Sequence, residues 1–169
     1  GLRKVVLMEP QLLSCSVEAN MAPKLEWLQA RLDLDDMQLR KMVLTHPALF
    51  NYSIEDNLAP KLEWLQMRLD LNNGEQLRKV ARHVSVLRTS IDTLESKLAY
   101  LEREIGLSPA ELRDWVVKNP TLLGRSLANS YRPRLEACRA AGVDAKRVLS
   151  YASRADETFC KYTGIEPGA

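Results

Sequence analysis

The chain repeats one pattern of apolar and polar positions about every 37 residues. Residues 2–28 and 39–65 share Leu-Arg-Lys, Pro-x-Leu, Ser-x-Glu and Ala-Pro-Lys-Leu-Glu-Trp-Leu in one register. Copies three and four begin at Leu77 and Leu112, so successive starts lie 37, 38 and 35 residues apart. Near-constant spacing over four copies is typical of a helical array in which each repeat stacks on its neighbours.

The first part of each copy predicts an amphipathic helix. In copy two, Leu39, Met42 and Val43 fall on one face of such a helix. Arg40 and Lys41 then point to the opposite side, so we expect them to be exposed.

Proline predicts where this first helix ends. Pro47 has no amide proton and disfavours helix at the residue before it, so the helix should end at His46. Pro10 and Pro120 occupy the same place in copies one and four. Copy three has residues 84–85 (Val-Ser) there and is one residue shorter beyond this point, so its first helix is expected to run on or bend differently.

The second part of each copy predicts a turn and a second helix. Residues 53–56 (Ser-Ile-Glu-Asp) are typical of a cap followed by a single 3₁₀ turn. The second helix is expected to begin near Pro60, since proline is well tolerated at a first helical position. A stripe of leucines at 4, 3, 4 spacing requires a neighbouring repeat to bury it: Leu58, Leu62, Leu65 and Leu69.

The junctions between copies carry helix stop and start residues. Gly106 predicts a helix end, and Ser108 with Glu111 predicts a capping box that starts the next helix. Asp35 and Asn73 are expected to start helices in earlier copies. These boundaries predict repeats at 2–38, 39–76, 77–111 and 112–144, and then, after Asp144 as a cap, a helix over 145–153 within a partial repeat or C-terminal cap at 145–169.

These elements resemble the mTERF family, the mitochondrial transcription termination factor repeat proteins. Residues 120–123 (Pro-Thr-Leu-Leu) and 105–108 (Ile-Gly-Leu-Ser) match the family motif, and residues 10–13 and 47–50 match its proline element. The resemblance covers residues 2–142. Copy three lacks the proline, and copies one and two have Asp-Leu-Asp and Asp-Leu-Asn where the family has Leu-Gly-Leu, which brings the loop geometry into question.

The resemblance implies an all-α fold: a curved helical-repeat solenoid with two α-helices plus a short 3₁₀ turn per repeat. It implies a protein of the mitochondrion or chloroplast whose basic inner face follows double-stranded DNA or structured RNA. The family roles that it implies are transcription termination or regulation, RNA processing and ribosome assembly.

Composition and charge refine this expectation. The chain has 169 residues, of which 46% are hydrophobic and 27% charged, as in ordinary soluble proteins, and it contains no apolar run of membrane-spanning length. Its net charge is only +2, which argues weakly against a strong polyanion binder. Residues 1–76 hold 8 Lys and Arg against 11 Asp and Glu, whereas residues 77–169 hold 16 against 11. The C-terminal half is therefore expected to bind nucleic acid first.

Other functional classes find little support. The three cysteines are far apart and form no C-x-x-C, and the two histidines, His46 and His83, have no partner at a metal-like spacing. No glycine-rich phosphate loop and no set of nucleophile, base and orienting group is present. We therefore predict no catalysis, no cofactor and no metal. The chain starts at a repeat boundary with Gly1, so we expect a fragment or a processed product.

Two rows of cations are the candidate binding residues. Arg3, Arg40, Arg78 and Arg113 share one repeat position, and Lys4, Lys41 and Lys79 share the next. Stacked repeats would align them along a phosphate backbone. A second, weaker candidate row is Lys24, Lys61, Lys97 and Arg134. The alternative is that both rows are solvated helix faces with acidic partners. The predicted nucleic-acid-binding residues are Arg40, Lys41, Arg78, Lys79, Arg82, Arg88, Arg113, Arg125, Arg132 and Arg134.

An aromatic row occupies the second helix, with Trp27, Trp64 and Tyr100 at one repeat position. Base stacking is one interpretation of this row, but packing beside the leucine stripe is favoured.

The sequence thus predicts a monomeric, non-catalytic nucleic-acid-binding protein of organellar gene expression. The alternative is a helical protein-interaction scaffold in an organellar ribosome or expression complex, because solenoids also bind proteins. The acidic first half would suit a basic partner, and a ribosomal or methyltransferase protein is the partner that this alternative expects.

Overall fold

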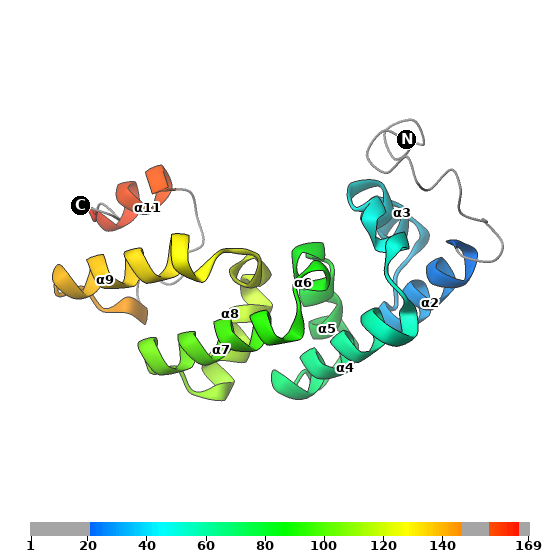
Figure 1. The fold of residues 1–169 in the computed structure, drawn as a ribbon, viewed down its shortest axis with the longest axis horizontal. Helices are drawn as coiled ribbons and strands as arrows, with labels where there is room; N and C mark the ends of the chain where they lie inside the picture. The colour runs from blue at the N-terminus through cyan, green and yellow to red at the C-terminus, as the bar shows by residue number, and fades with distance from the viewer. Residues whose placement is uncertain (1–20, 147–155, 166–169) are drawn as a thin grey trace. The chain divides into compact units, whose positions relative to one another are not determined.

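The computed structural model describes residues 21–146 and 156–165, and every regular element in these ranges is helical (Figure 1). The chain divides into two compact units, residues 1–88 and 89–169. This division falls inside the third predicted repeat. The predicted helix end at Pro10 and most of the predicted helix at 145–153 lie outside the described residues.

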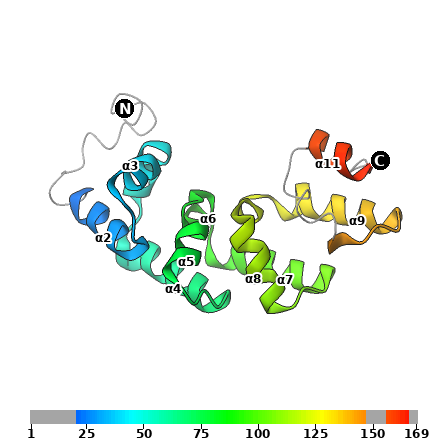
Figure 2. The same ribbon diagram turned by 180° about the vertical axis from the view of Figure 1, so that it is seen from behind.

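The first unit contains five α-helices and two short turns among its described residues. They are α2 (Ala22–Leu32), α3 (Asp36–Thr45), the 3₁₀ helix η3 (Pro47–Asn51), the π turn η4 (Ile54–Leu58), α4 (Ala59–Arg68), α5 (Gly74–Ala81) and α6 (Val84–Arg88). Helix α5 packs against both α2 and α4, and its place beside α4 is visible in Figures 1 and 2.

The second unit follows the same plan from its second helix onward. Its elements are α7 (Ile91–Ile105), α8 (Pro109–Lys118), the 3₁₀ helix η5 (Pro120–Gly124), the π turn η6 (Leu127–Tyr131), α9 (Arg132–Ala140) and α11 (Asp156–Thr163). Helices α7 and α8 lie against each other. Phe159 of α11 packs with Cys138 of α9 and with Ile165, so the residues 156–165 close one end of this unit's core.

The predicted leucine stripe forms the core of the first unit. Leu58, Leu62 and Leu65 are completely buried, and Leu69 is only 2% exposed. Because apolar burial is the main favourable term in folding, this stripe fixes which face of α4 points inward. In α3, Met42 is buried while Arg40 and Lys41 are exposed, which confirms the predicted amphipathic face.

The predicted helix starts are also confirmed. The Asp35 carboxylate accepts a hydrogen bond from the Gln38 amide at 2.7 Å, and Ser108 forms a reciprocal capping box with Glu111. The Asn73 side chain accepts from the backbone amide three residues ahead at 2.8 Å. Each cap satisfies an amide that would otherwise have no partner in the first helical turn.

The junctions keep one geometry despite their different residues. Helix α7 ends with Gly106 in the left-handed conformation (φ 68°), and Asp33 and Asp70 adopt the same region after α2 and α4, with φ of 49° and 47°. Aspartate is among the few non-glycine residues that tolerate this conformation. The departure of copies one and two from Leu-Gly-Leu therefore leaves the helix stop intact.

This geometry gives a direct stability prediction. Gly106→Ala should lower the free energy of unfolding by about 1 kcal/mol, because an alanine at positive φ is strained. A Cβ there would meet no heavy atom within 4 Å, so the change tests backbone conformation alone. Gly74→Ala is the matched control: its Cβ also meets open space, but its φ is not positive, so stability should stay equal or rise. Urea unfolding measures both, and equal losses would contradict the assignment.

The short turns differ from the prediction in their placement. The 3₁₀ turn follows Pro47 directly, as η3, whereas the Ser53-led turn η4 is a π turn in which the Leu58 amide donates to the Ser53 carbonyl at 3.1 Å. The sequence prediction of a 3₁₀ turn at 53–56 was therefore wrong, although a 3₁₀ turn is present in the repeat. In the fourth copy the same pair of turns recurs as η5 and η6.

A comparison with the third copy indicates that the π turn accommodates one additional residue. Lys61 lies eight positions after Ser53, but Lys97 lies only seven positions after Ser90. In α7 the Leu94 amide donates to the Ser90 carbonyl four residues back, so the helix is α from its first residue. A π turn holds one residue more than an α turn. The extra residue is absorbed there, and Lys61 and Lys97 donate to equivalent backbone carbonyls of the next repeat.

Candidate functional site

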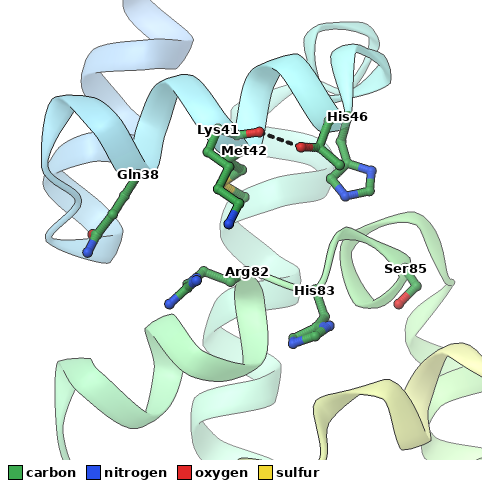
Figure 3. Close-up of a pocket in the computed structure, with 8 residues that line it drawn as sticks. Gln38, Lys41, Met42, His46, Arg82, His83 and Ser85 are labelled. Carbon is green, nitrogen blue, oxygen red and sulfur yellow. Dashed lines mark hydrogen bonds between the residues drawn. The ribbon is translucent and has the colours of Figure 1, made fainter.

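Two exposed cations of the first unit, Lys41 and Arg82, lie where α3 ends and where α5 turns into α6. Pro47 stops α3 after Thr45, and the chain breaks between α5 and α6 at Arg82 and His83. These two ends border a cavity of about 310 Å³ (Figure 3). Its lining residues are Gln38, Lys41, Met42, Thr45, His46, Arg82, His83 and Ser85.

The two sides of this pocket contribute different cations. Lys41 extends from α3 toward Arg82 on the α5–α6 side, as Figure 3 shows. Within the described part of the chain, neither side chain forms an ion pair, and no carboxylate is among the lining residues. The buried Met42 provides an apolar wall. Cations beside an apolar wall in a concave site favour an anionic ligand.

The charge of this region also acts on the two histidines. Burial lowers the pKa of His46, and the charges of Arg88 and His83 lower it further. Burial likewise lowers the pKa of His83, with a smaller contribution from Arg82. Since an ordinary imidazole titrates near 6.5, both rings are mainly neutral at neutral pH. The pocket therefore has a positive field that does not come from its histidines.

Arg78 and Lys79 of the predicted row have partners. The Arg78 guanidinium donates to the Asp33 carbonyl at 2.6 Å and contacts its carboxylate at 3.3 Å. Lys79 pairs with Glu75 one helical turn away at 2.8 Å and lowers the pKa of that carboxyl. Arg78 therefore joins α5 to the end of α2, which is a role in packing.

The cations of the second unit fall into two groups. Arg125 and Arg132 are exposed, and the Arg132 guanidinium lies 5.5 Å from the Tyr100 ring centroid. Arg113 is half-buried and lies 3.6 Å from Asp114. A smaller cavity beside α8 is lined by Glu111, Asp114, Trp115 and Lys118, so two carboxylates face it. This cavity is less suited to an anion than the pocket of the first unit.

The second predicted row does not lie on the surface. Lys24 donates to the Phe50 carbonyl, Lys61 to the Leu87 carbonyl, and Lys97 to the Leu123 carbonyl at 2.7 Å. Each acceptor lies 26 residues ahead, in the 3₁₀ or short α turn of the next repeat. Lys61 and Lys97 are only 4% and 6% exposed, and burial lowers the pKa of both. These lysines link neighbouring repeats.

Arg134, one of the predicted binding residues, continues this row. It is 3% exposed, and its guanidinium lies 5.2 Å from the Phe159 ring centroid. Its repeat position is the buried one, so the side chain belongs to the core of the second unit. This repeat position holds lysine in three copies and arginine in the fourth, and these residue types gave no indication of burial.

The aromatic row favours packing. Tyr100 is 8% exposed, and Trp27 and Trp64 are half-buried beside the leucine stripe. None of the three offers a fully open ring face for a base.

Sequence reasoning predicted both cations of the pocket, Lys41 and Arg82, but did not assign a binding role to its other members. As candidate functional residues, His46 and His83 were considered only as metal ligands, and Gln38, Thr45 and Ser85 were not proposed as binding residues. The two histidines are 37 residues apart, one residue less than the 38-residue spacing between the starts of copies two and three. Because stacked repeats bring equivalent positions together, that spacing was the available indication of a shared site.

Two further structural observations concern metal ions and membranes. Among residues 21–146 and 156–165, no His, Cys, Asp or Glu cluster has the composition to hold a metal ion. In the same ranges no helix has both the length and the apolar character to cross a membrane.

A comparison of the sequence with protein-family models matches the mTERF family over residues 1–159. A comparison with curated proteins finds no match. The family match spans almost the whole chain, and the repeated helix pairs described above are the helical repeat of that family. The chain therefore belongs to the mTERF family, a family of helical-repeat proteins that act on nucleic acid in organellar gene expression.

Proposed function

We propose that this protein holds double-stranded DNA or structured RNA through phosphate contacts, as a non-catalytic factor in transcription termination or regulation, RNA processing or ribosome assembly in a mitochondrion or chloroplast. The observation that carries the proposal is the convergence of Lys41 and Arg82 on a pocket without carboxylates. Phosphate contacts from lysine and arginine supply most of the affinity in sequence-tolerant binding.

Neighbouring cations extend this surface. Arg40 precedes Lys41 on the exposed side of α3, and Arg88 ends α6, where its charge already acts on His46. Within the described residues, neither arginine forms an ion pair. In the second unit, Arg125 and Arg132 are exposed cations of the same kind. We therefore place the main phosphate contacts on the first unit, with the arginines of the second unit as a further contact region.

A salt titration tests the proposal. If four cations of the first unit contact phosphates, the plot of log affinity against log salt should have a slope of about −4, from roughly −0.9 per neutralised phosphate on duplex DNA. Fluorescence anisotropy with a labelled duplex DNA and a structured RNA of equal length would measure it. The absence of binding to both at low salt would rule out the proposed function.

A protein-scaffold role is the alternative that one observation favours. Met37 and Met67 are 78% and 76% exposed, and Met67 borders a cavity of about 460 Å³ with Glu63, Gln66, Leu71 and Asn72. Exposed methionines suit adaptable protein contacts. A ribosomal or methyltransferase protein that co-purifies with the chain, while nucleic acid does not bind at low salt, would support this alternative.

A further inference from the structure

Both histidines of the chain lie in one pocket. The sequence contains only two, His46 and His83, and the two helix ends bring them into the same lining. They come from different repeats, His46 from the end of α3 and His83 from the turn between α5 and α6. Both imidazole rings of this chain therefore titrate in the pocket.

The groups that face these rings are cations. On α3 the charged neighbour is Lys41; on the α5–α6 side the neighbours are Arg82 and, at the end of α6, Arg88. No carboxylate is among the lining residues, and no carboxylate contributes to the electrostatics of either imidazole. In the empty pocket, burial and like charge thus both oppose protonation.

The pocket also has the size and polarity for a phosphate group. Its volume of about 310 Å³ is many times the roughly 10–15 Å³ that one water requires. Gln38, Thr45 and Ser85 supply polar side chains around it, and the Thr45 hydroxyl already donates to the Lys41 carbonyl at 2.6 Å. A phosphate that enters this space meets Lys41, Arg82 and both imidazoles.

We propose that this pocket binds one backbone phosphate of the nucleic acid and that His46 and His83 take up protons as the phosphate enters. The inference rests on the proposed function and adds regulation to it. The phosphate charge offsets the repulsion from the surrounding cations, so each ring that was neutral becomes a charged donor to a phosphate oxygen. Binding is then coupled to proton uptake.

The sign of the pH dependence follows from this coupling. A complex that carries more protons than its free components is favoured as the pH falls, by at most tenfold per pH unit for each proton taken up. Duplex affinity should therefore rise by about tenfold or more between about pH 8 and pH 6. Backbone phosphodiesters stay ionised in this range, so the change reports the protein.

Direct titration of the two rings is the first experiment. Imidazole resonances in NMR would give both pKa values in the free protein and with a saturating duplex that lacks terminal phosphates. We expect each value to rise by about one unit in the complex. Inorganic phosphate is the second probe: if it shifts the rings and the duplex does not, the pocket binds free phosphate and the proposal is overturned. Rings that respond to neither probe also overturn it.

Affinity measurements give an independent readout. The double variant His46→Gln with His83→Gln should bind the duplex with almost no pH dependence between about pH 6 and 8. Its affinity at the higher pH should match the unmodified chain, since the rings are neutral there. Cys160→Ser, at a half-buried position in the second unit, is a control that should keep the full pH dependence.

The outcomes separate the two proposals. Steep salt dependence without any pH dependence in the unmodified chain would refute proton uptake and leave phosphate binding standing. No duplex binding at either pH would refute both. Circular dichroism checks that the glutamine variants fold; if they do not, the NMR titration of the unmodified chain still decides the question.

Discussion

Lys97→Ala should lower the free energy of unfolding of the second unit by about 2–3 kcal/mol, a large effect for one lysine. The Lys97 ammonium donates to the Leu123 carbonyl at 2.7 Å and is 6% exposed. Removal of the side chain leaves a buried carbonyl without its partner and a space where the alkyl chain lay. Both losses destabilise the contact between successive repeats.

Two further variants separate these contributions. Lys97→Met retains most of the alkyl chain but has no donor, so it isolates the hydrogen bond and should be less destabilising than alanine. Lys79→Ala removes an exposed lysine whose ion pair, among residues 21–146 and 156–165, is with Glu75 on the same helix. Its effect should be below about 0.5 kcal/mol. Urea unfolding followed by circular dichroism would measure all three. If Lys97→Ala and Lys79→Ala lowered the free energy of unfolding equally, the buried lysine would stabilise the fold no more than the exposed one.

The second large effect concerns binding. Lys41→Glu combined with Arg82→Glu should weaken duplex affinity by about 100-fold or more and reduce the salt slope by about two, because two phosphate contacts are lost and replaced by repulsion. Both side chains are exposed at the pocket edge and form no ion pair within the described residues. The helices should therefore form normally, and circular dichroism can confirm it.

The matched control carries the same change of net charge elsewhere. Arg103→Glu with Arg139→Glu reverses two exposed arginines that both contact Glu104 in the second unit. Its duplex affinity should fall far less, with a small loss from long-range electrostatics. Equal losses in the two double variants would mean that overall charge, and not the pocket, determines affinity.

Local residue chemistry made the helix boundaries predictable. The stop at Pro47, the caps at Asp35 and Ser108, and the left-handed end at Gly106 each depend on one residue and its immediate neighbours. The apolar stripe of α4 was predictable because a 3.6-residue period places its leucines on one face whatever lies beyond. These features can be predicted without knowing which repeat packs against which.

The candidate site was only partly predictable, because exposure depends on the neighbouring repeat. Lys41 and Lys61 are both lysines at regular repeat positions, yet the first is exposed and the second donates to a carbonyl of the next repeat. Arg78, which was predicted as a phosphate contact, donates to the carbonyl of Asp33, 45 residues away in the chain. Nothing in the local sequence distinguishes a cation that faces solvent from one that faces the next copy.

The pocket itself required the fold. Its cations and histidines come from two helix ends that are about 40 residues apart in the chain, and neither end is basic enough alone to indicate an anion site. The net charge of each half pointed to residues 77–169. The structure instead gathers Lys41, from the acidic half, with Arg82, from the start of the basic half. Charge balance averaged over long segments therefore gives no information on the position of the proposed site, which is built from single side chains.

The π turns have a consequence for how members of such a repeat can differ in length. Between the capping serine and the buried lysine, one residue can be gained or lost while both ends stay in register, as Ser53–Lys61 and Ser90–Lys97 demonstrate. An alignment of repeats should therefore place a single-residue gap inside this helical segment and not in the loops that flank it. Insertions, which usually accumulate in loops, here have a tolerated position within a continuous helix.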